Sequence, residues 1–278
     1  MFGRMIQMVS QFAAPAPGLQ LGVTVLGSGS AGNAVVVHSP EGNLLVDAGF
    51  SLVELRRRLA TAAIPEESLR AILVTHEHGD HVKGLRVAAK ALKIPVFCNR
   101  LTATVLRDGG LAPEAELTLF TAGSAFRIGA FTVEPFCIPH DAVDASAFAF
   151  HLGDLKLGLA TDLGHANSLT MHHLAACDLL VVESNHDPKM VWASGRPAMV
   201  KQRILGRRGH LSNEDCAKLL QRVLHTRTRH LVLAHASREC NCYDLVEKTA
   251  RDCIRALGRT DLAPHVARQD VPLATLWA

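Results

Sequence analysis

A short stretch of the sequence gathers four side chains of the kinds that bind metal ions: His76, His78, Asp80 and His81. They follow the apolar run 71–75, which predicts a buried strand that ends where the cluster begins. Imidazole and carboxylate groups suit borderline divalent ions such as Zn²⁺ or Mn²⁺, and the absence of a nearby cysteine argues against a structural thiolate site. The stretch therefore predicts a metal site that can keep a position open for water.

One turn cannot supply every ligand of a two-metal site, so further ligands are expected at the ends of later strands. Three residues stand at such positions, each directly after a short apolar run: His140, Asp162 and His235. The two oxygens of a carboxylate such as Asp162 carry enough lone pairs to bridge two cations. We therefore predict two divalent metal ions as cofactors, with Zn²⁺ or Mn²⁺ as the leading candidates.

A glycine-rich segment separates two predicted strands near the start of the chain. Glycine lets backbone N–H groups approach an anion closely, and an asparagine adds an amide donor. An ordinary turn between strands explains the same pattern equally well. The candidate substrate-binding residues in this segment are Ser28, Gly29, Ser30 and Asn33.

Two more candidates for substrate contact lie after apolar runs in the second half. Asn185 follows such a run closely, although Asp187 and Pro188 just beyond it also make a good turn start. Ser237 stands just past His235 and is a candidate for contact with a substrate phosphate. Both residues therefore enter the predicted site as substrate-binding residues.

The elements that must position these residues are short strands and a few helices. In the first half, β-rich runs between glycine-containing turns predict strands, and leucines at helical spacing predict the first helix. The expected strands cover residues 21–27, 34–38, 43–47 and 71–75. The expected helices lie around residues 52–59, 82–93 and 101–107.

The second half repeats the alternation of strands and helices. A capping-box spacing at residues 212–215 predicts a helix that continues to about residue 225, and another helix carries His172 and His173. The expected strands cover residues 117–120, 126–128, 131–138, 147–152, 156–160, 178–183 and 230–235. Two sheets packed face to face with helices outside satisfy this pattern. The predicted fold is therefore an α/β (α+β) chain arranged as an αββα sandwich.

The composition is that of a globular protein with a large core. Of 278 residues, 48% are hydrophobic and 20% charged, and the net charge of +3 is too small to indicate a nucleic-acid or membrane partner. Seven scattered cysteines favour reduced thiols and a cytoplasmic location, and no apolar run approaches the length of a membrane span. We expect a flexible tail over residues 1–20 and a single domain over residues 21–278.

The histidine-rich turn, together with His140, Asp162 and His235, resembles the pattern of the metallo-β-lactamase superfamily, and the resemblance covers nearly all of the chain. Further motifs resemble the YycJ/WalJ-type branch of that superfamily: residues 26–33, 45–49, 183–187, 209–213 and 233–237. The resemblance implies a metallo-β-lactamase-type sandwich over residues 21–278. It also implies phosphodiester hydrolysis, with a 5′-to-3′ DNA exonuclease activity attributed to the branch.

The resemblance further implies a role for each site residue. One metal would be held by His76, His78 and His140, and the other by Asp80, His81 and His235, with Asp162 bridging. Asp80 is also assigned to catalysis, and Asp47 would support the metal turn through hydrogen bonds. His210 and Glu183 resemble the His–Glu pair of the tRNA-processing ribonucleases (RNase Z), which implies that His210 donates a proton and Glu183 orients it.

Several alternatives stay open at this point. A small-molecule hydrolase on the same metal core, such as a cyclic phosphodiesterase, lactonase or thioesterase, uses the same ligands, and a catalytically silent interaction protein keeps the same fold. The basic residues of the stretch 201–208 are expected in a loop between glycines, where they either contact a nucleic-acid backbone or remain solvated. A DNA substrate is the favoured partner, while the oligomeric state and the roles of Cys240 and Cys242 stay open.

Overall fold

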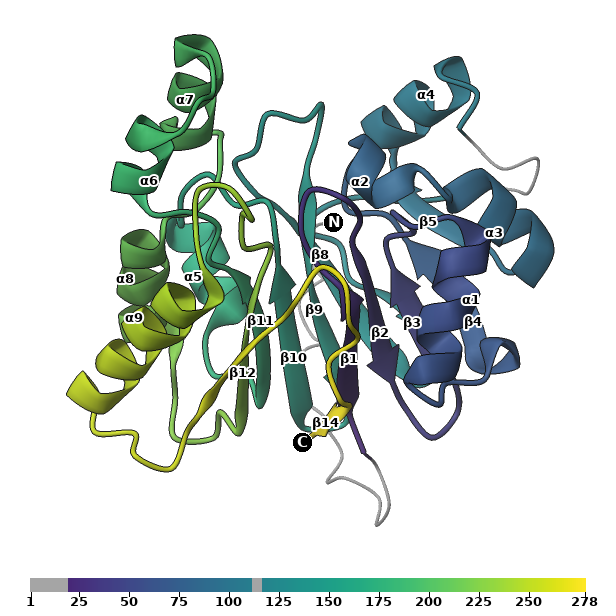
Figure 1. Cartoon of the computed structure of the whole chain (residues 1–278). Coiled ribbons are helices and arrows are strands. Elements are labelled where there is room, and N and C mark those ends of the chain that lie inside the picture. The colour runs from purple at the N-terminus through teal and green to yellow at the C-terminus, as the bar shows by residue number, and fades with distance from the viewer. Residues whose placement is uncertain (1–19, 112–116) are drawn as a thin grey trace, which may run out of the picture.

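The computed structural model describes residues 20–111 and 117–278. Apart from residue 20, the predicted N-terminal tail lies outside the described residues. Two seven-stranded sheets form the centre of the molecule, and helices cover their outer faces (Figure 1). This arrangement confirms the predicted αββα sandwich.

The first sheet has the strand order β14-β1-β2-β3-β4-β5-β6. Its strands are β1 (Gly22–Gly27), β2 (Ala34–His38), β3 (Asn43–Val46), β4 (Leu69–Leu73), β5 (Val96–Asn99), β6 (Leu117–Phe120) and β14 (Leu276–Trp277). Strands β1 to β3 pair antiparallel as a meander, whereas β3 to β6 run parallel. The parallel strands therefore end at one edge of the sheet.

The second sheet has the order β13-β12-β11-β10-β9-β8-β7. Its strands are β7 (Phe126–Ile128), β8 (Phe131–Cys137), β9 (Ser146–Leu152), β10 (Leu155–Ala160), β11 (Leu179–Glu183), β12 (His230–Ala234) and β13 (Pro264–Val266). Strands β7 to β10 form an antiparallel meander, and β10 to β13 run parallel. The strands that precede the predicted ligands thus share one direction in this sheet too.

The helices differ in part from the sequence prediction. They are α1 (Leu52–Thr61), the 3₁₀ turn η1 (Glu66–Ser68), α2 (Gly79–Val82), α3 (Leu85–Leu92), α4 (Arg100–Asp108), α5 (Ser168–Leu174), α6 (Pro188–Ala193), α7 (Ala198–Leu205), α8 (Asn213–Val223) and α9 (Tyr243–Ala256). None of the helices in the described part of the chain combines the length and apolarity that a membrane crossing requires.

Two of the sequence predictions for the helical segments were wrong. The helix expected over 82–93 begins only at Leu85, because the Gly84 N–H donates to the Ala48 carbonyl oxygen at 2.8 Å instead of to a helical carbonyl. The basic stretch expected as a loop is partly helical, since Lys201 and Arg203 lie on α7 and only Arg207 and Arg208 follow it. Gly206 and Gly209 end the helix and shape the turn after it rather than opening the whole stretch.

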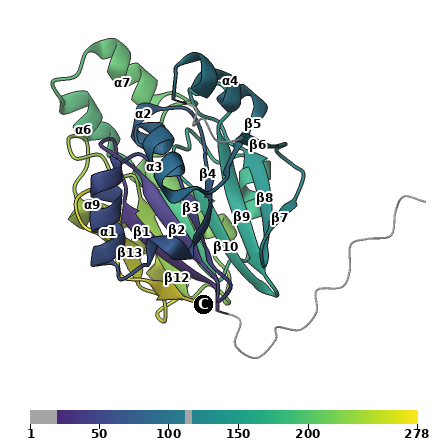
Figure 2. The same ribbon diagram turned by 90° about the vertical axis from the view of Figure 1, so that its right-hand side faces the viewer.

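Three apolar clusters hold the layers together. Side chains such as Val23, Leu73, Phe148 and Leu157 fill the space between the two sheets. The outer face of the first sheet packs on α1, α3 and α4, and that of the second on α5, α8 and α9. Figure 1 shows the two sheets between these helical layers, and Figure 2 looks onto the layer with α1 and α3 in front of the first sheet. The burial of both faces explains why most strands are apolar throughout rather than alternating.

Candidate active site

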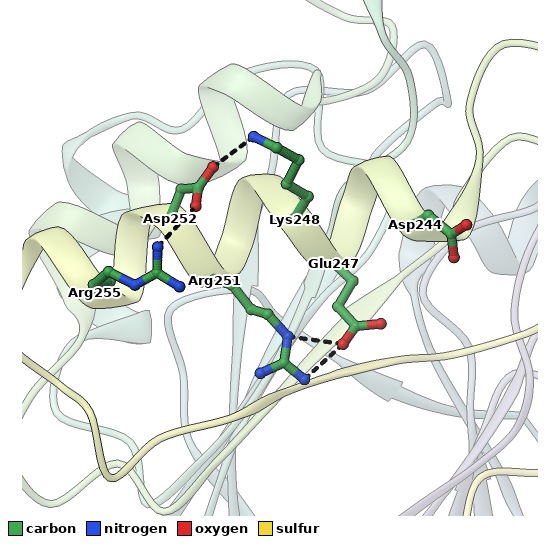
Figure 3. A pocket seen from close by; sticks show the side chains of 6 residues that line it. All are labelled: Asp244, Glu247, Lys248, Arg251, Asp252 and Arg255. Atoms are coloured by element: carbon green, nitrogen blue, oxygen red, sulfur yellow. Dashed lines mark hydrogen bonds and ion pairs between the residues drawn. The ribbon is translucent and has the colours of Figure 1, made fainter.

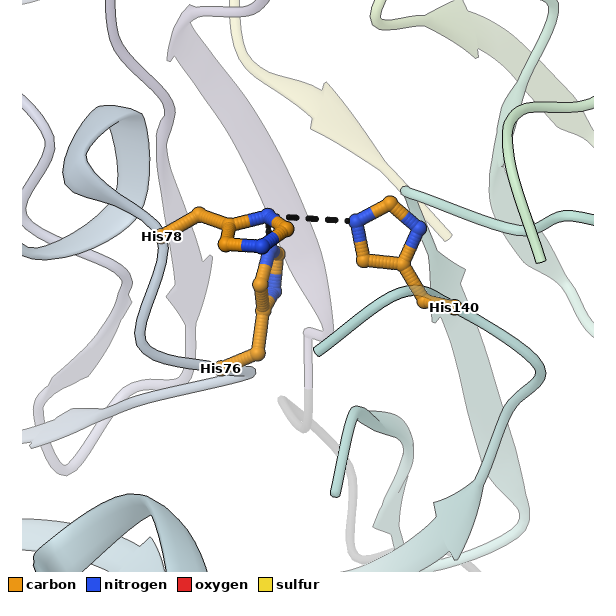
Figure 4. A group of neighbouring side chains, drawn as sticks. All are labelled: His76, His78 and His140. Atoms are coloured by element: carbon orange, nitrogen blue, oxygen red, sulfur yellow. Dashed lines mark hydrogen bonds between the residues drawn. The ribbon is translucent and has the colours of Figure 1, made fainter. Parts of the chain in front are cut away.

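Three predicted histidine ligands from separate segments converge at the edge where the strands end. His76 and His78 follow β4, and His140 follows β8 (Figure 4). His78 Nδ1 lies 3.1 Å from His76 Nε2 and 3.2 Å from His140 Nε2. His140 Nδ1 donates to the Gly209 carbonyl oxygen at 3.0 Å, which leaves its Nε2 facing the other rings. The three rings could therefore hold one metal ion together, each through one nitrogen.

The second predicted group adjoins the first. Asp80 Oδ2 lies 3.6 Å from His81 Nε2 and 3.5 Å from His235 Nε2. All three ligand atoms fall within 4.8 Å of one another. A mixed set of one carboxylate and two imidazoles is suited to Zn²⁺ or Mn²⁺.

Asp162 lies between the two groups. Its Oδ2 is 3.1 Å from His81 Nε2, and its Oδ1 is 3.5 Å from His235 Nε2 and 3.9 Å from His140 Nε2. Asp162 Oδ2 and His235 Nε2 are buried and have no hydrogen-bond partner among the described residues. Buried polar atoms without partners are costly. A bound cation would satisfy them, so the donor set fits a metal centre.

The charges of this cluster depend on one another. Burial opposes ionisation of Asp162, but His235 and His81 outweigh it and hold its pKa well below the usual range. Burial likewise lowers the pKa of His81, yet the Asp162 and Asp47 carboxylates raise it well above the ordinary value. Burial and the neighbouring charge of His81 hold the pKa of His76 well below its ordinary value. Asp162 is therefore ionised and His76 neutral, which are the protonation states in which a carboxylate and an imidazole bind a metal ion.

Asp47 supports the histidine turn through hydrogen bonds, as the resemblance implied. Its Oδ1 accepts from the Thr75 backbone N–H at 2.8 Å, and its Oδ2 accepts from the Thr75 hydroxyl at 2.8 Å and from His81 Nδ1 at 2.7 Å. The His81 Nε2 is thereby left to face Asp162. Asp47, Asp162 and His235 all have a positive φ, between 57° and 62°, within two residues of the ends of their strands. Such backbone strain is concentrated at functional sites.

Glu183 joins a predicted metal ligand to the predicted proton donor. Its Oε1 lies 2.8 Å from His210 Nδ1 and 2.9 Å from His235 Nδ1. Its Oε2 accepts from the backbone N–H groups of Leu163 and Leu211 at 2.7 and 2.9 Å. Although burial opposes ionisation, His210 and His235 lower the pKa of Glu183 to about 2. Burial lowers the pKa of His210, but Glu183 outweighs it and raises the pKa. His210 is therefore suited to carry a proton.

The glycine-rich turn packs against the cluster. Asn33 Nδ2 lies 3.2 Å from Asp80 Oδ2 and 3.1 Å from His81 Nε2, while its Oδ1 accepts from the Gly29 N–H at 2.9 Å. Ser28 Oγ accepts from the His235 N–H at 2.9 Å. Ser28, Gly29 and Asn33 are buried, whereas Ser30 is exposed. The buried residues thus hold the turn in place and leave Ser30 at the surface.

Asn185 and Ser237 also lie beside His235. The Asn185 side-chain amide donates to the His235 carbonyl oxygen at 2.7 Å, and the Ser237 N–H donates to the Asn185 carbonyl oxygen at 2.8 Å. Ser237 Oγ accepts from the Cys240 N–H at 3.0 Å. These contacts tie both residues to the loop that carries His235, and the substrate contact expected of them stays a prediction.

Sequence reasoning missed three residues that organise the site. Glu77 accepts from the Val143 N–H at 2.8 Å, and its place within the histidine motif was a usable signal. Asp141 Oδ1 lies 3.2 Å from His140 Nε2, a position that its place next to a ligand could have indicated. Gln269 receives the Ala31 N–H at 2.8 Å and donates to the Gly32 carbonyl oxygen at 2.8 Å. Nothing local marks Gln269, because it is more than 230 residues away in sequence.

A second surface feature, a shallow hollow on α9, lies apart from the cluster (Figure 3). Ion pairs along the helix neutralise its charges, including Lys248–Asp252 at 2.8 Å and Arg251–Glu247 at 2.6 Å. Such exposed pairs contribute little stability, and they involve five of the six charged side chains that line the hollow. The histidine and carboxylate cluster is therefore the candidate functional centre.

Known proteins are similar to this chain in sequence. A family model for the β-lactamase superfamily domain matches residues 42–236. Exodeoxyribonuclease YycJ of Bacillus anthracis is 35% identical over 236 residues, which cover 84% of this chain and 89% of that protein. Exodeoxyribonuclease WalJ of Streptococcus pneumoniae is 33% identical over 246 residues, which cover 87% of this chain and 90% of that protein.

Solved structures agree at the level of the fold. The metallo-β-lactamase fold protein YhfI from Bacillus subtilis superposes with a TM-score of 0.69 at 16% identity, covering 94% of this chain and 100% of that chain. The family model spans the whole cluster from His76 to His235. The chain therefore belongs to the metallo-β-lactamase superfamily and, within it, to the YycJ/WalJ branch.

Proposed function

We propose that the protein is a dinuclear metal-dependent phosphodiesterase that degrades DNA from the 5′ end. The observation that carries the proposal is the position of the Glu183–His210 pair beside the ligand cluster, with Glu183 Oε1 also 2.9 Å from the ligand His235. A proton donor fixed beside a two-metal site suits the cleavage of an ester with a poor leaving group.

The proposed ligands divide as the resemblance implied. His76, His78 and His140 would hold one ion, Asp80, His81 and His235 the other, and Asp162 would contact both. When bound, two Zn²⁺ or Mn²⁺ ions would neutralise the negative charge that develops on the phosphate oxygens. The convergence of these donor atoms and the unsatisfied Asp162 Oδ2 support the assignment.

His210 has the role of proton donor to the leaving oxygen. Glu183 orients its Nδ1 and stays ionised, so the imidazole readily takes up and releases a proton. The side chain of His210 is 20% exposed, whereas that of Glu183 is fully buried, so His210 is the member of the pair that a substrate can reach.

The assignment to DNA rests on the relatives. The two proteins that are 33–35% identical over most of the chain are both named exodeoxyribonucleases. For the phosphate contact we retain the glycine-rich turn, with Ser30 exposed at its tip and Ser28, Gly29 and Asn33 holding it against Asp80 and His235. Asn185 and Ser237 complete the proposed binding residues. All seven cysteines are free thiols, which supports a cytoplasmic location.

The direct test is digestion of single- and double-stranded DNA, labelled at either end, by protein loaded with Zn²⁺ or Mn²⁺. The proposal predicts release of nucleotides from the 5′ end and loss of activity on chelation. Asp80→Asn should abolish the reaction, and the exposed Asp154→Asn in the β9–β10 turn is the matched control. Turnover of a small ester without any DNA cleavage would replace the proposal with a small-molecule hydrolase.

A further inference from the structure

The segment between β11 and the proton donor forms a strongly basic projection. We call residues 188–208, which include α6 and α7, the α6–α7 arm. It carries six basic residues and no acidic one, while the whole chain has a net charge of only +3. Both views show α6 and α7 standing beyond the sheets at the end of the sandwich (Figures 1 and 2). The positive charge of the protein is therefore concentrated on this arm.

The base of the arm is fastened to the candidate metal site. Arg208 donates from Nε to the His140 carbonyl oxygen at 2.8 Å and from Nη2 to the Ala142 carbonyl oxygen at 3.0 Å. Arg203 on α7 forms an ion pair with Asp141, the residue after His140. His140 itself donates to Gly209, immediately after the arm. An extended ligand bound along the arm would consequently reach the candidate metal ligands.

Much of the charge on the arm has no acidic partner. Arg196 pairs with Glu239 at 2.8 Å, and Arg203 pairs with Asp141. Four other cations have no ion pair with a carboxylate among the described residues: Lys189, Lys201, Arg207 and Arg208. Uncompensated cations beside a hydrolytic site attract a polyanion such as a phosphodiester chain.

The arm also exposes two large apolar side chains. Trp192 on α6 is 59% exposed and Met199 on α7 is 80% exposed. Lys201 Nζ donates to the Trp192 carbonyl oxygen at 2.8 Å, which ties the two helices together. An exposed aromatic ring among unpaired cations is the combination that binds single-stranded nucleic acid, because the ring stacks on a base while the cations contact phosphates.

We propose that the α6–α7 arm is the docking surface for a single-stranded segment of the nucleic-acid substrate. Trp192 stacks on a base, and Lys189, Lys201 and Arg207 contact the backbone phosphates. A duplex would offer the phosphates but not an unstacked base. The inference rests on the proposed function and names the part of the molecule that holds the substrate outside the metal site.

The test is binding of a 5′-fluorescent single-stranded DNA, followed by anisotropy with chelator present so that no cleavage occurs. Trp192→Ala should weaken binding about tenfold or more, because stacking on an aromatic ring contributes strongly for each base, and Trp192→Phe should retain most of the affinity. Lys189→Gln should reduce the salt dependence of binding by about one contact. Lys248→Gln on α9 removes an equally exposed cation elsewhere and should leave binding unchanged.

A second readout separates docking from chemistry. With metals bound, Trp192→Ala should raise KM for single-stranded DNA and leave the hydrolysis of a small chromogenic phosphodiester unchanged. Unaltered DNA affinity in Trp192→Ala, equal losses on both substrates, or an effect confined to duplex DNA would overturn the inference. If the wild type binds DNA through the arm but never cleaves it, the proposed function fails while the docking surface stands.

Discussion

Glu183 holds His210 through a 2.8 Å contact between Oε1 and Nδ1, and the same oxygen lies 2.9 Å from His235 Nδ1. One buried carboxylate thus orients both the proposed proton donor and a proposed metal ligand. Its other oxygen is fixed by two backbone N–H groups, so the carboxylate has little freedom to move. This relationship links the proposed proton donor directly to the proposed metal site through one fixed side chain.

The first prediction concerns proton donation by His210. His210→Gln should lower kcat on DNA by about 10²- to 10⁴-fold, the usual contribution of general acid catalysis. A substrate with a nitrophenolate leaving group should lose far less, because that group departs without a proton. Metal content, measured by mass spectrometry, should stay at the wild-type value. An equal loss of rate on both substrates would contradict the assignment.

Asp47 should set the metal affinity although it is not a proposed ligand. Asp47→Asn preserves a side chain that tolerates φ 62° but removes the charge facing His81 Nδ1. We expect metal affinity to fall about 10- to 100-fold, as measured by titration against a competing chelator. Asp154→Asn, in the exposed turn before β10, is the control. Unchanged affinity in Asp47→Asn would remove this residue from the account of the site.

The contact between Gly49 and the metal turn allows no side chain. A Cβ at Gly49 would lie 1.7 Å from the Asp80 carbonyl oxygen and 2.6 Å from the Asn33 nitrogen. Gly49→Ala should therefore lower the free energy of unfolding by about 1–3 kcal/mol or more, as overpacked cores do, and reduce metal binding. Gly195→Ala meets no described atom within 4 Å and should be neutral. Equal melting temperatures for the two variants would contradict the close approach.

Acid should destabilise the fold partly through His38. Burial lowers the pKa of His38 to about 4, with the Asn43 hydrogen bond opposing the shift. Below about pH 6.5, His38 is protonated in the unfolded chain but stays neutral in the folded protein. The free energy of unfolding therefore falls as the pH is lowered to about 4, by on the order of 3 kcal/mol in total. In urea unfolding, the difference in the free energy of unfolding between the wild type and His38→Gln should therefore be smaller at pH 4.5 than at pH 7. An equal difference at both pH values would refute the prediction.

Local sequence patterns predicted the strands and showed that the candidate ligands follow them. His76, His140, Asp162 and His235 each follow an apolar strand, and strands of one direction bring such residues to a common edge. The features that the sequence patterns did not predict depend on contacts between residues far apart in the sequence. The break at Gly84 arises from the hydrogen bond of its N–H to the Ala48 carbonyl oxygen, and the glycine-rich turn is held by Gln269. Neither partner is marked by spacing or composition.

The helical arm was missed for a different reason. Gly206 and Gly209 suggested a loop over the whole basic stretch, but Pro197 precedes the first turn of α7, and the helix continues to Leu205. Proline at a helix start supports the helix rather than breaking it. Short helices such as α6 and α7 have too few turns for an apolar period to stand out. The contacts of the arm with His140 and Asp141 could be found only from the fold.

Two divalent ions are proposed to lie between the histidine turn and His235, and anomalous diffraction from crystals of the Zn²⁺- or Mn²⁺-loaded protein would locate them. We expect two peaks, one contacted by His76, His78 and His140 and one by Asp80, His81 and His235, with Asp162 touching both. A single peak, or two peaks of which either lies outside these residues, would contradict the proposal.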